Sequence, residues 1–153
     1  LLNRVWELIA EELRAFVGPT HSVGMTAFEE ICRTWTLRQA AAGRLPFLPD
    51  AVGRHWAADC EVDVAAINWR QRQILLGERK WGANPVGRNI VRALVEEKTP
   101  RVLARLDGEW QTHYAFFARV GFTDAARQEA ARAGARTVDL AQLDQDLRSV
   151  RRT

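Results

Sequence analysis

The chain has 153 residues, of which 47% are hydrophobic and 27% charged, a balance typical of one globular domain with its own core. No apolar run approaches the roughly 20 residues that span a bilayer, and no basic segment followed by an apolar one opens the chain. We therefore expect neither membrane insertion nor a signal peptide. Cys32 and Cys60 form neither a metal-binding pair nor a disulfide framework, which predicts a reduced, cytoplasmic setting.

The net charge of +3 comes almost wholly from arginine, which is compatible with a polyanionic partner, although a solvated arginine-rich surface gives the same count. The period of the apolar residues changes along the chain from helical to strand-like and back. The predicted helices cover residues 2–17, 26–40, 86–98, 100–106, 124–133 and a last charged stretch, and the predicted strands cover 52–57, 61–69, 73–81, 113–119 and 136–140.

The order of these elements predicts an α/β fold. The strands over 61–69 and 73–81 form an antiparallel hairpin, whereas the helix-separated later strands can pair in parallel. We expect an α/β/α sandwich with a central mixed sheet, preceded by an extra N-terminal helix. Residues 1–20 would link the domain over 21–153 to a preceding segment, and the apolar first helix could also seal an oligomer.

Two acidic residues and a lysine form the most informative pattern. Glu78 and Lys80 are two apart in one predicted strand, so their side chains share a face. If the hairpin turns about residues 70–71, Asp63 lies opposite Glu78 and Glu61 lies opposite Lys80. The side chains of Asp63 and Glu78 share a face in any register in which the numbers of paired residues have an odd sum. The sequence therefore predicts two carboxylates and an ammonium group on one strand face.

This combination suits phosphodiester hydrolysis. Carboxylate oxygens are ligands for Mg²⁺ or Mn²⁺, which neutralises phosphate charge and lowers the pKa of a bound water. A neighbouring lysine can orient that water or stabilise the transition state. The alternative is an ordinary ion-pair ladder on a solvated strand face. The apolar run before Glu78, residues 74–76, favours a buried site over that ladder.

Several segments in this order resemble one known family. They are residues 27–33, 52–56, 61–65 and 77–81, with weaker likeness over 114–122 and 138–140. The chain resembles the restriction-endonuclease-like PD-(D/E)xK superfamily. It is most similar to the nuclease-like C-terminal domain of archaeal-type P-loop ATPases, a domain of unknown function. No ATPase P-loop motif occurs here, so the resemblance implies an isolated C-terminal module whose partner is the ATPase portion of a longer chain.

The resemblance implies a role for each matching residue. Asp63 and Glu78 would bind the metal, the backbone carbonyl of Arg79 could be a third ligand, and Lys80 would serve the attacking water. Glu29 would reach the site from the helix over 26–40. The residue before Asp63 is Val62 where the family pattern has proline, a departure that removes no ligand.

Glu29 also has a structural interpretation. The spacing from Thr26 to Glu29 fits a capping box, in which the glutamate accepts a hydrogen bond from the N-cap amide. Both interpretations stay open, with Glu30 as the neighbouring candidate. Arg70, Arg72 and Arg88 are candidates for contacts to a nucleic-acid backbone, and solvated surface arginines are the alternative for each.

Two functions from different classes follow. The first is a Mg²⁺-dependent nuclease that hydrolyses phosphodiester bonds in nucleic acid, with DNA as the expected substrate. The second is a catalytically silent domain that binds nucleic acid or regulates the ATPase. The complete set of Asp63, Glu78 and Lys80 favours the first. A pure protein-interaction domain, a third alternative, would bind no divalent metal.

Overall fold

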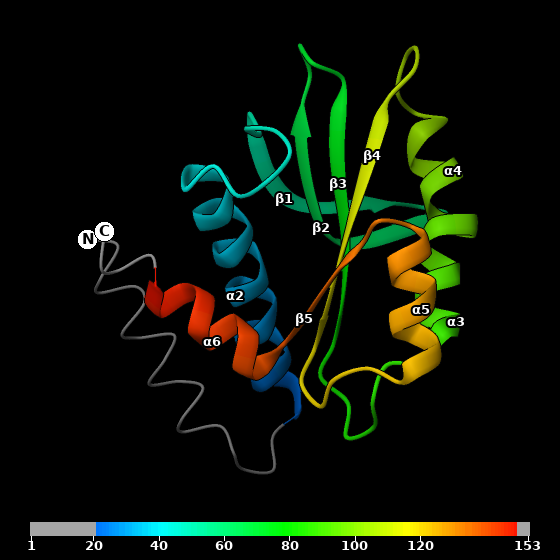
Figure 1. Ribbon diagram of the computed structural model, residues 1–153. Coiled ribbons are helices and arrows are strands. Elements are labelled where there is room, and N and C mark those ends of the chain that lie inside the picture. The colour runs from blue at the N-terminus through cyan, green and yellow to red at the C-terminus, as the bar shows by residue number, and fades with distance from the viewer. Residues whose placement is uncertain (1–20, 150–153) are drawn as a thin grey trace.

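The computed structural model describes residues 21–149, which form a mixed sheet covered by helices on both faces (Figure 1). The predicted helix over 2–17 and the proposed linker over 1–20 lie outside the described residues. The elements are α2 (His21–Ala41), β1 (Ala51–Ala57), β2 (Cys60–Asn68), β3 (Gln73–Lys80), α3 (Arg88–Arg92), the π-helical segment η1 (Ala93–Lys98), α4 (Thr99–Leu103), β4 (Gln111–Ala118), α5 (Asp124–Arg132), β5 (Arg136–Asp139) and α6 (Leu140–Ser149).

The five strands lie in the sheet in chain order, from β1 to β5. The first three are antiparallel to one another, and β4 and β5 then continue in parallel with β3. A parallel connection needs a crossover, and the helices between β3, β4 and β5 provide it. The predicted α/β/α sandwich with a central mixed sheet is therefore confirmed.

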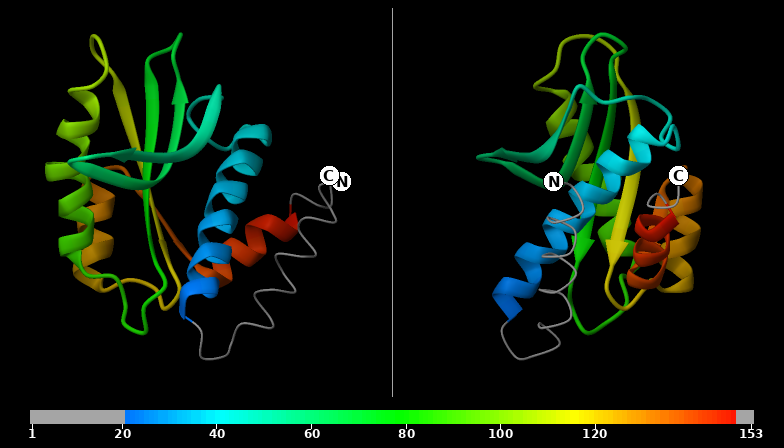
Figure 2. Two further views of the ribbon diagram at one scale, coloured as in Figure 1. Left: turned by 180° about the vertical axis from the view of Figure 1, so that it is seen from behind. Right: turned by 90° about the vertical axis from the view of Figure 1, so that its left-hand side faces the viewer.

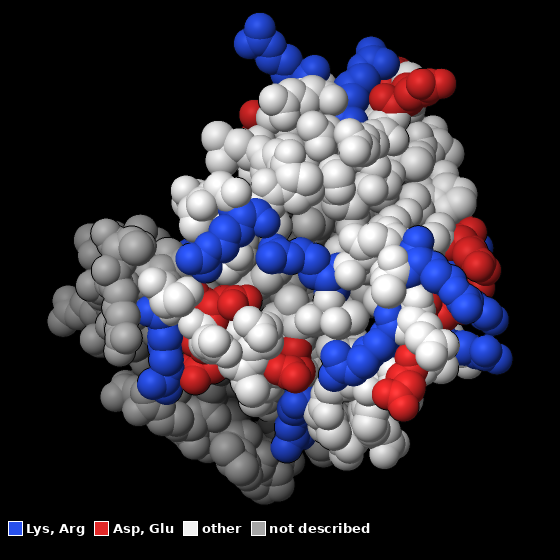
Figure 3. Space-filling model, viewed as in Figure 1, with Lys and Arg blue, Asp and Glu red and all other residues white. Residues whose placement is uncertain are grey.

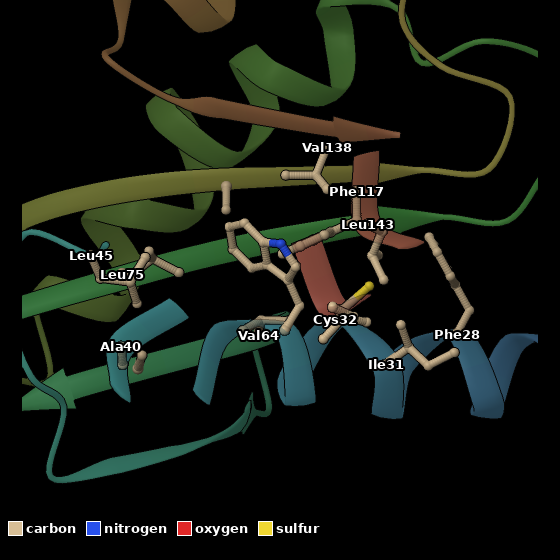
Figure 4. Packing of buried hydrophobic residues seen from close by; sticks show 14 of the residues in the cluster. Phe28, Ile31, Cys32, Ala40, Leu45, Val64, Leu75, Phe117, Val138 and Leu143 are labelled. Carbon is tan, nitrogen blue, oxygen red and sulfur yellow. The ribbon is translucent and has the colours of Figure 1, made fainter. Parts of the chain in front are cut away.

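Two apolar cores lie on opposite faces of this sheet. Figure 2 shows the helices that cover each face. On one face α2 and α6 pack against the sheet, with Trp35 and Phe117 in edge-to-face contact. Figure 4 shows this core between α2 and the strands. On the other face the helical run α3–η1–α4 and α5 cover Leu76 and Phe116. Burial on both faces explains why β3 and β4 read as continuous apolar runs.

Two helices differ from the sequence-based expectation. Helix α2 begins at His21, so Thr26 lies inside it and the capping-box interpretation of Glu29 is wrong. The helix predicted over 86–98 begins at Arg88 and becomes π-helical from Ala93. There the Thr99 amide donates to the carbonyl of Leu94, five residues earlier, and the Thr99 hydroxyl donates to the same carbonyl at 2.7 Å. This wide turn lies directly before Pro100, which has no amide hydrogen to donate.

Gly77 lies where β3 passes close to its neighbours, one residue before Glu78. A Cβ atom at Gly77 would lie 3.1 Å from the carbonyl oxygen of Ala115 and 3.1 Å from the Cβ of Val64. We expect Gly77→Val to lower the free energy of unfolding by about 2 kcal/mol or more, because the larger side chain overpacks the core. Gly53→Val on β1 is the control, since no atom lies within 4 Å of a Cβ at Gly53. Equal losses in urea unfolding would contradict this packing.

Candidate functional site

The β2–β3 hairpin has the predicted register. Its ladder runs from Asn68–Gln73 to Val64–Gly77, and continuing that register places Asp63 opposite Glu78. Beyond this ladder the first residues of β2 pair with β1, and Glu61 forms an ion pair with Arg54 rather than with Lys80. The hairpin thus brings Asp63 to Glu78, as predicted, whereas the ion pair with Arg54 replaces the expected pairing of Glu61 with Lys80.

A β-bulge sets the position of Asp63. Gly53 of β1 pairs with Ala65 and His55 pairs with Val62, so one residue of β1 faces the two residues Asp63 and Val64 of β2. The bulge reverses the alternation of β2: Val64 joins the core under α2, whereas Val62 joins the core on the other face. Figure 1 shows the first part of β2 bending with β1 toward α4. Asp63 lies at this bend, where its Oδ2 accepts a hydrogen bond from the Arg79 amide at 3.1 Å.

A cavity of about 410 Å³ opens at the C-terminal end of β3. The three residues of the predicted constellation, Asp63, Glu78 and Lys80, all line it. Its other lining residues are Glu61, Arg79, Trp81, Gly82 and Lys98. The strand supplies Glu78 and Lys80, the bulge supplies Asp63, and the end of η1 supplies Lys98.

Glu78 is a buried acid with two charged neighbours. Its residue is only 7% exposed, and its Oε1 accepts a hydrogen bond from Lys98 Nζ at 2.6 Å. Burial raises the pKa of Glu78 to about 7. The bond to Lys98 opposes this rise, and the adjacent Asp63 carboxylate adds to it. The pocket therefore disfavours a second negative charge beside Asp63 unless a cation compensates it.

The sequence did not point to Lys98 as a site residue, although the composition of the chain offers one indication. The chain contains twenty arginines and two lysines, and those two are Lys80 and Lys98. The fold brings both into one pocket, although they are 18 positions apart in the sequence. An ammonium group is a compact point charge, whereas a guanidinium is a wide planar fork. The use of lysine here fits a pocket that needs small cations beside its carboxylates.

Arg79 links the predicted Glu29 to the site. Its side chain points to the α2 side, where Nη2 donates to Glu29 Oε2 at 3.0 Å, and Arg33 donates to the other Glu29 oxygen at 2.8 Å. Partial burial acts to raise the pKa of Glu29, but Arg79 and then Arg33 outweigh it and lower that pKa. Glu29 does not line the pocket itself but bonds Arg79, which does. Glu30 is more exposed and pairs with Arg33.

The arginines predicted to contact nucleic acid do not form a single group. Arg70 and Arg72 lie in the hairpin turn, at the far end of β3 from Lys80, roughly 25 Å away at about 3.3 Å per residue. The Arg72 guanidinium packs against Gly108. Arg88 is exposed at the start of α3, after the loop that leaves the pocket. In Figure 3 lysines and arginines alternate with acidic side chains on the face shown, rather than forming one basic band.

The donors at the pocket fit a hard divalent cation. Asp63 and Glu78 offer carboxylate oxygens, and strand alternation turns the Arg79 carbonyl toward β2, because the Lys80 carbonyl accepts from Arg119 beside β4. Within residues 21–149 no group of three or more His, Cys, Asp or Glu side chains is placed to hold a metal. One or two carboxylates with water and substrate oxygens are the usual ligands of Mg²⁺, so the residues present fit this ion.

The chain belongs to the DUF234 family, described as archaeal and bacterial proteins of unknown function, whose model matches residues 2–105. The matched region includes Glu29, Asp63, Glu78, Lys80 and Lys98. No curated protein matches the chain. No solved structure matches it either. Among the helices of the described region, none has the length and apolar character required to cross a bilayer.

The raised pKa of Glu78 predicts a pH-dependent stability. Its pKa of about 7 in the folded protein lies above the ordinary 4.5. The protonated Glu78 carboxyl therefore stabilises the folded state fully below pH 4.5, and this stabilisation is lost as pH rises to about 7. We expect wild-type stability to fall over this range, relative to Glu78→Gln, by on the order of 3 kcal/mol. Urea unfolding from pH 4 to pH 8 measures this difference. Parallel pH profiles for the two proteins would contradict it.

Proposed function

We propose that this chain is a metal-dependent nuclease domain that hydrolyses phosphodiester bonds in nucleic acid, with DNA as the preferred substrate. The observation that carries the proposal is the convergence of Asp63, Glu78 and Lys80 in one cavity at the end of β3. Their order and parity are those of the PD-(D/E)xK pattern, and the mixed sheet with helices on both faces suits a restriction-endonuclease-like fold.

Each residue has a role in this chemistry. Asp63 and Glu78 would hold Mg²⁺ or Mn²⁺, which supplies charge neutralisation at the phosphate and a bound water of lowered pKa. Lys80 is exposed beside them, where its ammonium group can orient the attacking water and stabilise charge that develops on the phosphate. Arg79 holds Asp63 through its backbone amide, and Glu29 fixes the Arg79 side chain from α2.

Contacts to the substrate beyond the cavity are part of the proposal. Arg88 is the best placed of the predicted arginines, because it begins the helix that follows the pocket loop. Arg70 and Arg72 could contact only a substrate that extends along the whole hairpin. The P-loop ATPase portion of a longer chain is the proposed covalent partner, and the cytoplasm is the proposed setting.

A second candidate function is a catalytically silent domain that binds nucleic acid or regulates the ATPase. The bond from Lys98 to Glu78 favours it, because this bond neutralises one of the two proposed metal ligands without any metal. The two candidates differ in one property: the first requires cleavage that depends on both a divalent ion and Lys80.

The nuclease proposal is tested by incubating linear, single-stranded, branched and supercoiled DNA, and single-stranded RNA, with the chain and Mg²⁺ or Mn²⁺. We expect metal-dependent cleavage of DNA that Asp63→Ala and Lys80→Ala each reduce by at least about a hundredfold. Gel electrophoresis of the products gives the rates.

Two variants outside the cavity serve as matched controls. Asp59→Ala removes a carboxylate that pairs with Arg105, and Arg101→Ala removes a cation that bonds the Asp59 carbonyl. Both should retain cleavage near the wild-type rate. Cleavage that persists in Asp63→Ala and Lys80→Ala would indicate a contaminant. That result, or no cleavage at all, would overturn the nuclease proposal in favour of the silent domain.

A further inference from the structure

We propose that Lys98 is an internal counter-ion that competes with the divalent metal for Glu78 and is released when a substrate phosphate enters the cavity. This inference rests on the proposed function, and it adds a regulatory step to it: metal binding coupled to substrate binding. Lys98 lies outside the Asp63–Glu78–Lys80 constellation and belongs to a different element, η1.

The first observation is the geometry at Glu78. Lys98 Nζ lies 2.6 Å from Glu78 Oε1, in the cavity that both residues line. A metal ion would bind a carboxylate oxygen at about 2.1 Å. An ammonium group and a dication cannot both lie within bonding distance of one oxygen atom without strong repulsion in a partly buried site. A metal ion bound through Glu78 Oε1 would therefore require Lys98 to move away.

The second observation is the unequal exposure of the two partners. The Lys98 side chain is 31% exposed, whereas that of Glu78 is 8% exposed, so the cation can swing toward solvent while the acid stays in place. The backbone of Lys98 is held independently, because its carbonyl accepts a weak hydrogen bond from the Cys60 thiol at 3.8 Å. The long flexible stem can thus change partner without displacing η1.

The third observation is the choice of residue. In a chain with twenty arginines, the two lysines both line this cavity. An arginine at position 98 would offer Glu78 a wide two-pronged partner that releases it less readily. A phosphodiester has the opposite charge to Lys98 and enters the same cavity under the proposed function. Its oxygens can accept the ammonium group that leaves Glu78, so substrate and metal would bind cooperatively.

The inference is tested by measuring Mn²⁺ binding to the chain by electron paramagnetic resonance, with and without a short phosphorothioate DNA duplex that resists hydrolysis. In the wild type we expect weak binding that tightens about tenfold with DNA. Lys98→Met should bind Mn²⁺ about tenfold more tightly than the wild type without DNA, and DNA should then add little. Lys98→Arg, which keeps the charge, should bind Mn²⁺ no better than the wild type.

Arg101→Met is the control for net charge, because Arg101 lies three residues further along the chain and bonds the Asp59 carbonyl instead of Glu78. It should change Mn²⁺ affinity by less than about twofold. Equal Mn²⁺ affinity in the wild type and Lys98→Met would overturn the competition while leaving the nuclease proposal intact. If no variant binds Mn²⁺, even with DNA, the proposed metal site itself is wrong. Should Lys98→Met not fold, Lys98→Gln provides the same comparison.

Discussion

Two carboxylates that lie side by side in a partly buried pocket need a compensating cation, and the described site is organised around this need. Asp63 and Glu78 come together at the end of β3, where burial raises the pKa of Glu78 to about 7. Lys98 supplies a positive charge in the structure, and a divalent metal would supply more. The proposed catalysis and the proposed regulation are two results of this one electrostatic constraint.

Different elements of the fold contact the two carboxylates, Asp63 and Glu78. The β-bulge turns Asp63 to the Arg79 amide, and the hydrogen bond from Arg79 to Glu29 ties this point to α2. On the opposite face the π-helical segment η1 ends at Lys98, directly before Thr99 and Pro100. Irregular backbone thus occurs on two sides of the cavity. Bulges and π-helical turns are frequent near functional sites because they redirect individual side chains.

Much of the fold and of the candidate site could be predicted from the sequence. The hairpin register followed from strand parity and the position of the turn, so the proximity of Asp63, Glu78 and Lys80 was predicted. The bulge could not be predicted, because an extra residue in one strand leaves no mark on local composition. Lys98 was missed because its approach to Glu78 depends on how η1 packs against the sheet. The spacing from Thr26 to Glu29 fitted a capping box, but α2 begins at His21, so Thr26 lies inside the helix and not at its start.

The central claim is that Asp63 and Glu78 form one metal site, and the anomalous scattering of Mn²⁺ in crystals of the chain tests it most directly. We predict one ion at the end of β3, bonded at about 2.1 Å to an oxygen of each carboxylate, with Lys98 turned away from Glu78. An ion-free pocket at saturating Mn²⁺, with the Lys98–Glu78 bond unchanged, would contradict the account.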